Sequence, residues 1–331
     1  MRTMINIKNI SERAMQGEGL TREEALGVLD YPDDRLPELI DAAYSVRKKY
    51  FGNRVGVQVL LNAKSGLCSE NCGYCTQSSV SGAAIKEYPL RPEAELVEGA
   101  LNAKKSGAAR FCIALSSIRY DDGLINNLAA SVRSIKKEAV ISLCCSMGFL
   151  TPKQAALLKS AGLDRINHNL NSSREFYPKI CTTHTWDDRI NNLKTCREAG
   201  LEICSGGIIG LGEGKEGAAD LFMELRKIRP DSIPVNFYIP VEGTPLEKKG
   251  DPLTPAYCMK ALCLARLSNP DSDIRAAGGR EYHLRSMQGL CLYVVNSIFV
   301  SGYLTTGGQP AGEGFEMIRD MGFSAELEGV E

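Results

Sequence analysis

The sequence lacks the long apolar and strongly charged segments that mark membrane and nucleic-acid-binding proteins. The 331-residue chain contains no run of about 18 apolar residues, the length that spans a bilayer. Neither charge sign dominates, because 39 Lys and Arg stand against 40 Asp and Glu, and basic runs such as Lys104-Lys105 are short. We therefore expect no membrane and no nucleic acid among its partners.

A secretory signal is also missing, because the first residues, MRTMINIKNISERAMQGEGL, carry no apolar core. We expect a cytoplasmic protein, and the cytosol keeps thiols reduced, so the 12 cysteines are not expected to form disulfides. Histidine is scarce: His168, His184 and His283 show neither HExxH nor HxxxH spacing, which argues against a histidine-based zinc site. The cysteines remain as core residues, metal ligands or catalysts.

Short β-branched runs alternate with segments of helical period, which predicts an α/β protein. A chain that is 44% hydrophobic can bury a sizeable core. Strictly alternating βα units need a parallel sheet, and eight of them fit a closed (βα)8 barrel of the TIM type, with an open doubly wound sheet as the alternative. The expected strands are 57–61, 110–115, 140–147, 163–170, 202–209, 232–239, 273–277 and 293–300. The expected helices include 92–106, 151–161, 186–199, 213–228, 254–267 and 312–321.

The domain organisation follows from the same pattern. Residues 1–50 precede the first expected strand and include ThrArgGluGluAlaLeu at 21–26, which is typical of a helix start. We find no linker or low-complexity segment. The sequence therefore predicts an N-terminal helical extension over 1–50 and one catalytic barrel domain over 51–331.

The strongest local motif is SGLCSENCGYCTQSS at 65–79, directly after the first expected strand. Cys68, Cys72 and Cys75 are spaced CxxxCxxC, and three thiolates in one polar loop can surround a small metal cluster. They fill three iron positions of a cubane and leave one iron open to a small molecule, whereas four-cysteine sites are closed. The alternative is a structural zinc or buried thiols, but no fourth Cys or His lies nearby in the sequence.

A second group of candidate ligands lies on separate expected strands. Cys112 is on the second strand, Cys144 on the third, Cys204 on the fifth and Arg275 on the seventh. Alternate residues of barrel strands point inward, so these groups can meet in the lumen. Three further cysteines, Cys196, Cys258 and Cys263, fall on expected helices and are interpreted as core residues.

Cys145 directly follows Cys144. Adjacent strand residues point to opposite faces, so in a regular strand only one of the two reaches the lumen. We interpret Cys145 as a thiol buried against the outer helices. The alternative is that it serves a cluster in the lumen.

A polar segment ends the fourth expected strand, where active sites of such barrels lie. It contains Asn167, His168, Asn169 and Asn171. A polar turn rich in asparagine is the alternative to a binding site. The GxGxxG pattern of Gly212, Gly214 and Gly217 is weak alone as a dinucleotide signature.

These motifs resemble those of the biotin synthases, a family of the radical S-adenosylmethionine (radical SAM) superfamily. The CxxxCxxC loop after the first barrel strand is similar to that of the superfamily, as is the aromatic Tyr74 before the last cysteine. The likeness covers nearly the whole chain. Its further markers are ArgPheCys at 110–112, AsnHisAsnLeu at 167–170, CysSerGlyGlyIleIleGlyLeuGlyGlu at 204–213, SerIleProValAsn at 232–236, GlyThrProLeu at 243–246 and AsnSerIlePhe at 296–299.

The resemblance implies an enzyme that inserts sulfur into dethiobiotin to make biotin. It implies a [4Fe–4S] cluster on the loop cysteines, S-adenosylmethionine on the open iron, and an auxiliary cluster, [2Fe–2S] or four-iron, as the sulfur donor. It also implies an electron donor such as flavodoxin or ferredoxin, and a homodimer. The alternatives are a related radical enzyme, such as a methylornithine synthase or a hydrogenase maturase, and a non-enzymatic electron carrier.

The resemblance further implies roles for individual residues. Asn171 stands where many biotin synthases carry Asp, which makes its contact with the cofactor less certain. The auxiliary ligands would be Cys112, Cys144, Cys204 and Arg275. The cofactor contacts would be Tyr74, Leu115, His168, Asn171, Ile208 and Ile239. The groups that hold the ureido ring of the substrate would be Asn167, Asn169 and Asn236.

Overall fold

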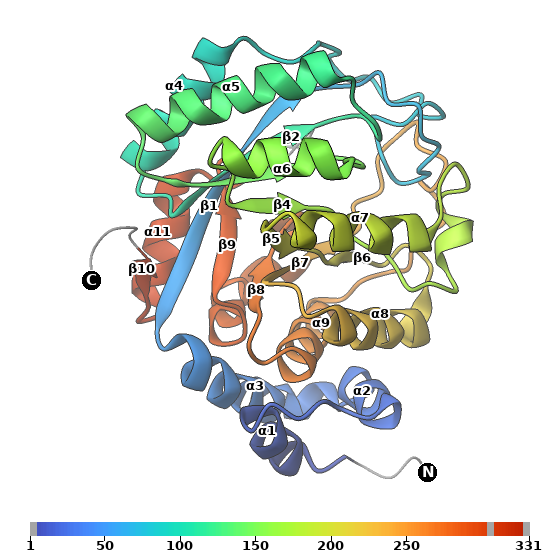
Figure 1. Ribbon diagram of the computed structural model, residues 1–331. Helices are drawn as coiled ribbons and strands as arrows, with labels where there is room; N and C mark the ends of the chain where they lie inside the picture. The colour runs from blue at the N-terminus through green and yellow to red at the C-terminus, as the bar shows by residue number, and fades with distance from the viewer. Residues whose placement is uncertain (1–4, 303–307, 327–331) are drawn as a thin grey trace.

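A closed barrel of parallel strands lies at the centre of the fold, in a computed structural model that describes residues 5–302 and 308–326 (Figure 1). The strands are β1 (Arg54–Lys64), β2 (Arg110–Leu115), β3 (Ser142–Ser146), β4 (Arg165–Asn167), β5 (Glu202–Cys204), β6 (Gly207–Ile209), β7 (Ser232–Phe237), β8 (Asp273–Ala276), β9 (Ser297–Val300) and β10 (Ser324–Glu326). They pair in the order β1-β2-β3-β4-β5-β7-β8-β9, and β9 pairs with β1 to close the ring. Because β6 continues the position of β5 and pairs with β7, the barrel has eight strand positions. The predicted (βα)8 barrel is confirmed.

Helices cover the outside of the barrel, mostly in the connections between strands (Figure 1). They are α4 (Glu93–Lys105), α5 (Asp122–Glu138), α6 (Pro152–Ser160), α7 (Trp186–Glu198), α8 (Gly214–Ile228), α9 (Pro255–Ser268), α10 (Arg280–Leu284) and α11 (Ala311–Asp320). Short 3-10 turns are η1 (Asp33–Arg35), η2 (Tyr177–Lys179), η3 (Arg285–Met287) and η4 (Gly289–Tyr293).

Three helices precede the barrel: α1 (Ile7–Met15), α2 (Arg22–Leu29) and α3 (Leu36–Phe51). They pack below it, against α8 and α9 (Figure 1). Arg22 of α2 forms an ion pair with Asp220 of α8, with Nε and Oδ1 2.7 Å apart. Lys260 of α9 pairs with Asp33. The N-terminal helices are thus tied to the later part of the barrel.

Several elements differ from the expectation. The expected strand 202–209 is broken into β5 and β6, and the expected strand 163–170 is shortened to β4. The expected strand 293–300 begins only at Ser297, because Val295 closes a turn on the Cys291 carbonyl, with N and O 2.8 Å apart. Buried apolar runs do not by themselves distinguish a strand from a turn. Strand β10, which pairs with β1, is short and polar and carries no strand pattern.

A reciprocal cap fixes where helix α7 begins after the loop that carries His184. Thr185 Oγ1 accepts a hydrogen bond from the Asp188 N–H at 3.1 Å, and Asp188 Oδ2 accepts one from the Thr185 N–H at 2.8 Å. Such a cap satisfies N–H groups that the first helical turn leaves free. It starts α7 immediately after His184, so that Arg189 enters the barrel mouth from the first turns of the helix.

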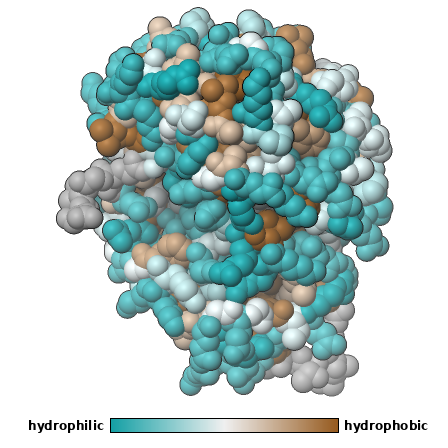
Figure 2. All heavy atoms as spheres, viewed as in Figure 1, coloured by the Kyte–Doolittle hydropathy of each residue, from teal (hydrophilic) through white to brown (hydrophobic). Residues whose placement is uncertain are grey.

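The face of the molecule in Figure 2 is mostly hydrophilic, with hydrophobic atoms in small separate patches. In the described parts of the chain, no helix is long and apolar enough to cross a membrane.

The break between β5 and β6 places site residues. Gly206 sits in the break, where its N–H donates to Asn169 Oδ1 and its carbonyl accepts from the Asn171 N–H, both at 3.1 Å. A Cβ atom on Gly206 would lie 2.0 Å from the Pro234 carbonyl oxygen. Only glycine allows this close approach of the two backbones.

We expect Gly206→Ala to lower the free energy of unfolding by about 1–3 kcal/mol, because the added methyl group cannot be accommodated without a backbone shift. Urea unfolding followed by circular dichroism measures the change. Gly19→Ala is the matched control, since a Cβ there meets nothing within 4 Å. Equal midpoints for the two variants would contradict the prediction.

Candidate active site

A cavity of about 290 Å³ opens at the C-terminal end of the barrel. Its wall combines the loop after β1 with the ends of β2, β4, β6 and β7. The structure brings together eleven of the predicted site residues here: Cys68, Cys72, Tyr74, Cys75, Leu115, Asn167, His168, Asn169, Asn171, Ile208 and Asn236. Ile239, which was expected to contact the cofactor, follows β7 and is not among the lining residues.

The CxxxCxxC loop is held by backbone hydrogen bonds to distant segments. The Gly73 N–H donates to the Ile180 carbonyl at 2.8 Å, and the Gly73 carbonyl accepts from the Leu246 N–H at 3.1 Å. Burial raises the pKa of the Cys75 thiol, so a free thiolate is disfavoured there unless a cation compensates it. Three sulfur donors in one cavity wall fit a cluster with three cysteine ligands and one open iron.

Asparagine side chains are fixed by the backbone at the strand ends. Asn236 Oδ1 accepts from the Gly278 N–H at 3.0 Å, and its Nδ2 donates to the Gly207 carbonyl at 3.1 Å. Asn171 has a φ of 69°, a left-handed conformation that asparagine adopts more readily than most residues. Asn167 Oδ1 is buried and has no hydrogen-bond partner. An unpartnered acceptor in a cavity wall suits a ligand that carries N–H donors.

His168 is neutral in this environment. Burial, followed by the charge of Arg189, lowers the pKa of His168 to about 3. Its Nδ1 lies 2.9 Å from the Met147 carbonyl oxygen and donates to it, while its Nε2 accepts from Arg189 Nη1 at 3.5 Å. Apolar Leu115 and Ile208, together with this imidazole, suit a nucleoside with a flat base and a polar sugar.

Arg189 and Glu70 also line the cavity, and neither was predicted as a site residue. Arg189 Nη1 donates to the Asn169 carbonyl at 2.8 Å, and its Nη2 lies 2.9 Å from His184 Nε2. Glu70 contacts His184 Nδ1. Glu70 and His184 are 114 residues apart in the chain, so no local spacing could reveal their contact.

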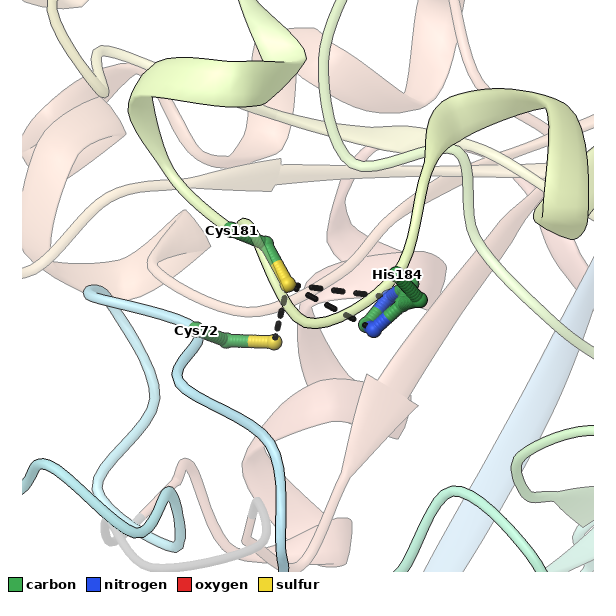
Figure 3. A group of neighbouring side chains, drawn as sticks. All are labelled: Cys72, Cys181 and His184. Carbon is green, nitrogen blue, oxygen red and sulfur yellow. Dashed lines mark hydrogen bonds between the residues drawn. The ribbon is translucent and has the colours of Figure 1, made fainter.

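A fourth cysteine and a histidine lie next to the motif in space, although none does in the sequence. Cys181 Sγ is 3.7 Å from Cys72 Sγ and 3.4 Å from His184 Nδ1, and all three side chains are buried (Figure 3). The hydrogen bond with Cys181, together with burial, raises the pKa of the Cys72 thiol. The only sequence signal was CysThrThrHis at 181–184, just before α7.

Deeper in the lumen lies a second group of thiols. Cys112 and Cys144 are register partners on β2 and β3 and share a small apolar cluster with Ala277 and Phe299. Their mutual hydrogen bond, together with burial, raises the pKa of Cys112. The same hydrogen bond lowers the pKa of Cys144 to about 7.

Arg275 reaches the same lumen from β8. Its Nη1 is 3.6 Å from Cys204 Sγ, and its guanidinium lies 5.0 Å from the centroid of the Phe299 ring. Nη2 donates to Ser232 Oγ at 2.7 Å and to Asp273 Oδ2 at 3.2 Å, while Nε is buried without a partner. Three thiols and a cation buried together inside the barrel fit an anionic iron–sulfur group.

The Cys145 side chain lies on the opposite face of β3 from that of Cys144. It pairs in register with Ile113 and is fully buried in the main hydrophobic core, apart from the cluster that holds Cys144. Burial raises its pKa. The regular strand thus separates the two adjacent thiols. The helix cysteines are likewise in the main core: Cys196, Cys258 and Cys263.

Comparisons with known proteins agree with this geometry. The radical SAM superfamily model matches residues 64–225, and the Biotin and Thiamin Synthesis associated domain matches residues 234–324. The biotin synthase of Geobacillus kaustophilus (strain HTA426) is 46% identical over 324 residues, which cover 98% of this chain and 97% of the relative. That of Bacillus cytotoxicus is 43% identical over 326 residues, which cover 98% of each chain.

Two solved structures share the fold at low identity. A methylornithine synthase superposes with a TM-score of 0.83 and 21% identity over 96% of this chain and 97% of that chain. A maturase of the [FeFe]-hydrogenase superposes with a TM-score of 0.82 and 16% identity over 98% of this chain and 76% of that chain.

Proposed function

The chain belongs to the biotin synthase family of radical SAM enzymes, and from this premise we propose which of its residues hold the clusters, the cofactor and the substrate. Its activity is the insertion of sulfur into dethiobiotin, which gives biotin in the last step of biotin biosynthesis. Identity of 43–46% with biotin synthases over nearly the full length favours this activity over that of the methylornithine synthase, which is 21% identical.

We assign the radical cluster to Cys68, Cys72 and Cys75. When bound, this [4Fe–4S] cluster and S-adenosylmethionine supply a 5′-deoxyadenosyl radical, and the auxiliary cluster supplies sulfur. The observation that carries the assignment is that all three thiols line one cavity together with Asn167, Asn169 and Asn236. Anaerobic reconstitution with iron and sulfide counts, followed by product analysis with dethiobiotin, tests it.

The cofactor contacts in this proposal are residues of the same cavity. Neutral His168 presents its ring without adding charge beside a sulfonium cation, and Asn171 presents an amide from its left-handed position. Ile239 is left out because it does not line the cavity. The remaining proposed contacts are Tyr74, Leu115 and Ile208.

The proposed substrate groups are Asn167, Asn169 and Asn236. Hydrogen must be removed from two unactivated carbons, so the ring has to be held in a fixed position. Amides donate and accept at once, which matches the N–H and C=O groups of a cyclic urea. The backbone bonds to Asn169 and Asn236 orient these amides before the substrate arrives.

The auxiliary cluster is assigned to Cys112, Cys144, Cys204 and Arg275, with Cys145 outside it. Support comes from the shared luminal chamber and from the unpartnered Arg275 Nε. Asp273 and Ser232 hold the guanidinium in place.

We also propose that the chain divides into a helical extension over 1–50 and a catalytic domain over 51–331. Its electron donor is of the flavodoxin or ferredoxin type. The protein is a homodimer with a cytoplasmic location. The family supports the donor, the dimer and the location. Analytical ultracentrifugation measures the dimer directly.

We expect Asn169→Ala to weaken dethiobiotin binding by about tenfold, the effect of one lost hydrogen bond of about 1.4 kcal/mol. It should also raise the ratio of 5′-deoxyadenosine to biotin, because a loosely held ring misses the radical. Asn169→Asp is the matched control for folding, since it keeps an acceptor for the Gly206 N–H. An unchanged product ratio in Asn169→Ala would count against the assignment.

A further inference from the structure

Cys72 belongs to a second cluster of metal-binding groups, formed with Cys181 and His184 (Figure 3). Cys72 lies in the loop after β1, whereas the other two lie between η2 and α7. All three side chains are buried, and their ligand atoms lie within 4.8 Å of one another. Neither Cys181 nor His184 is used by the assignments above.

Two of the three ligand separations match the edges of a tetrahedral site for one ion, and the third, between Cys72 Sγ and the His184 ring nitrogen, lies within 4.8 Å. Two sulfurs bound to one zinc ion at about 2.3 Å lie about 3.8 Å apart, and a bound sulfur and imidazole nitrogen lie about 3.6 Å apart. The corresponding separations are 3.7 Å between Cys72 Sγ and Cys181 Sγ, and 3.4 Å between Cys181 Sγ and His184 Nδ1. Little movement is needed to seat an ion.

We propose that, in the chain without its radical cluster, Cys72, Cys181 and His184 bind a single thiophilic divalent cation such as Zn²⁺. Two thiolates and one imidazole are ligands typical of this class of ion. Glu70 contacts His184 Nδ1 and lies beside the proposed site.

The surroundings complete such a site. When His184 Nδ1 binds the ion, the ring proton moves to Nε2, where the Tyr177 hydroxyl oxygen lies 2.7 Å away and accepts it. A histidine ligand commonly donates its second ring N–H in this way. Arg189 lies buried beside the ring, and because the two thiolates neutralise the ion, the carboxylate of Glu70 offsets the charge of Arg189. Arg189 then loses its hydrogen bond to His184 Nε2 and keeps its hydrogen bonds to the Tyr177 hydroxyl and the Asn169 carbonyl.

Cation binding at this site affects assembly of the radical cluster, an inference that rests on the proposed function. Cys72 cannot serve one cation in this tetrahedral site and a cubane at the same time. A bound Zn²⁺ therefore competes with assembly of the radical cluster, while Cys68 and Cys75 stay free of it.

The test uses the full chain, freed of iron under anaerobic conditions and titrated with Co²⁺ as the probe. Tetrahedral Co²⁺ bound to thiolates absorbs strongly in the near ultraviolet and the visible. We expect this spectrum in the wild type. Cys181→Ser should bind Co²⁺ more than about 100-fold more weakly, because it loses a direct ligand. Cys68→Ser should retain the wild-type spectrum.

Three variants separate the cation site from the radical cluster. Cys68→Ser should keep the Co²⁺ site and lose the radical cluster. Cys181→Ser should lose the Co²⁺ site and keep the radical cluster, and Cys72→Ser should lose both the Co²⁺ site and the radical cluster. His184→Asn is the second probe of the cation site, because it removes the imidazole with a side chain of similar size. In addition, one equivalent of Zn²⁺ added before iron and sulfide should lower the iron content of the wild type and not that of Cys181→Ser.

Wild-type Co²⁺ affinity in both Cys181→Ser and His184→Asn would overturn the cation site. Loss of the spectrum in Cys68→Ser to the same extent as in Cys181→Ser would also overturn it, since the ion would then sit within the CxxxCxxC loop. Unchanged iron loading after Zn²⁺ would overturn the competition. By contrast, a Cys68→Ser variant that assembles the full radical cluster would refute the proposed function and leave the cation site standing.

Discussion

Replacing any one of Cys68, Cys72 or Cys75 with Ala should abolish reductive cleavage of S-adenosylmethionine. With two cysteine ligands the radical cluster cannot be held, and no electron reaches the cofactor. Production of 5′-deoxyadenosine under a strong reductant should fall to the detection limit, and the spectroscopic signal of the radical cluster should disappear with it.

The barrel should survive these changes, because the cysteines lie in a loop outside the strands and Cys68 is partly exposed. Circular dichroism and thermal unfolding check this. Cys196→Ala in α7 is a suitable control for the loss of a buried thiol elsewhere and should cleave the cofactor like the wild type. A loop variant that still makes 5′-deoxyadenosine would refute the assignment.

The second large effect concerns the luminal chamber. Cys112→Ala or Cys204→Ala should keep cofactor cleavage and lose biotin formation, because the sulfur source is removed while the radical site remains. Iron counts after reconstitution should fall to those of the radical cluster alone. Mössbauer spectra of the wild type separate a two-iron from a four-iron auxiliary centre.

Cys145→Ala is the matched control for the chamber. It changes the same residue type one position away, on the core-facing side of β3. We expect wild-type biotin formation from it. If Cys145→Ala instead behaves like Cys204→Ala, Cys145 serves the cluster. If Cys112→Ala and Cys204→Ala both make biotin with an unchanged iron content, the chamber holds no auxiliary cluster.

Features that depend on local spacing were predictable from the sequence. The barrel follows from alternating strands and helices, and the inward direction of Cys112 and Cys144 follows from the two-residue period of a strand. Both appear in the structure, with the two thiols in one luminal cluster.

Features that depend on contacts between distant loops were not predictable. Cys181 and His184 approach Cys72 only because the segment before α7 folds over the loop after β1. Arg189 is fully enclosed, yet a lone arginine on a polar helix looks like a surface residue in the sequence. Strand β10 forms because β1 offers free backbone groups at its start, and not because of its own residues.

Closure of the barrel between β1 and β9 sets the order in which the protein can assemble on the ribosome. Gly56 and Val57 pair with Ser297 and Ile298, so the first strand leaves the ribosome long before β9, the strand that closes the barrel, exists. At about 5–20 residues per second, that delay lasts tens of seconds. One edge of β1 stays unpaired during this delay. The N-terminal helices likewise stay uncovered until α9, against which they pack, has been synthesised. Nascent chains therefore pass through an intermediate with an open barrel. Conditions that slow translation prolong the exposure of the unpaired β1 edge, which can pair with other chains.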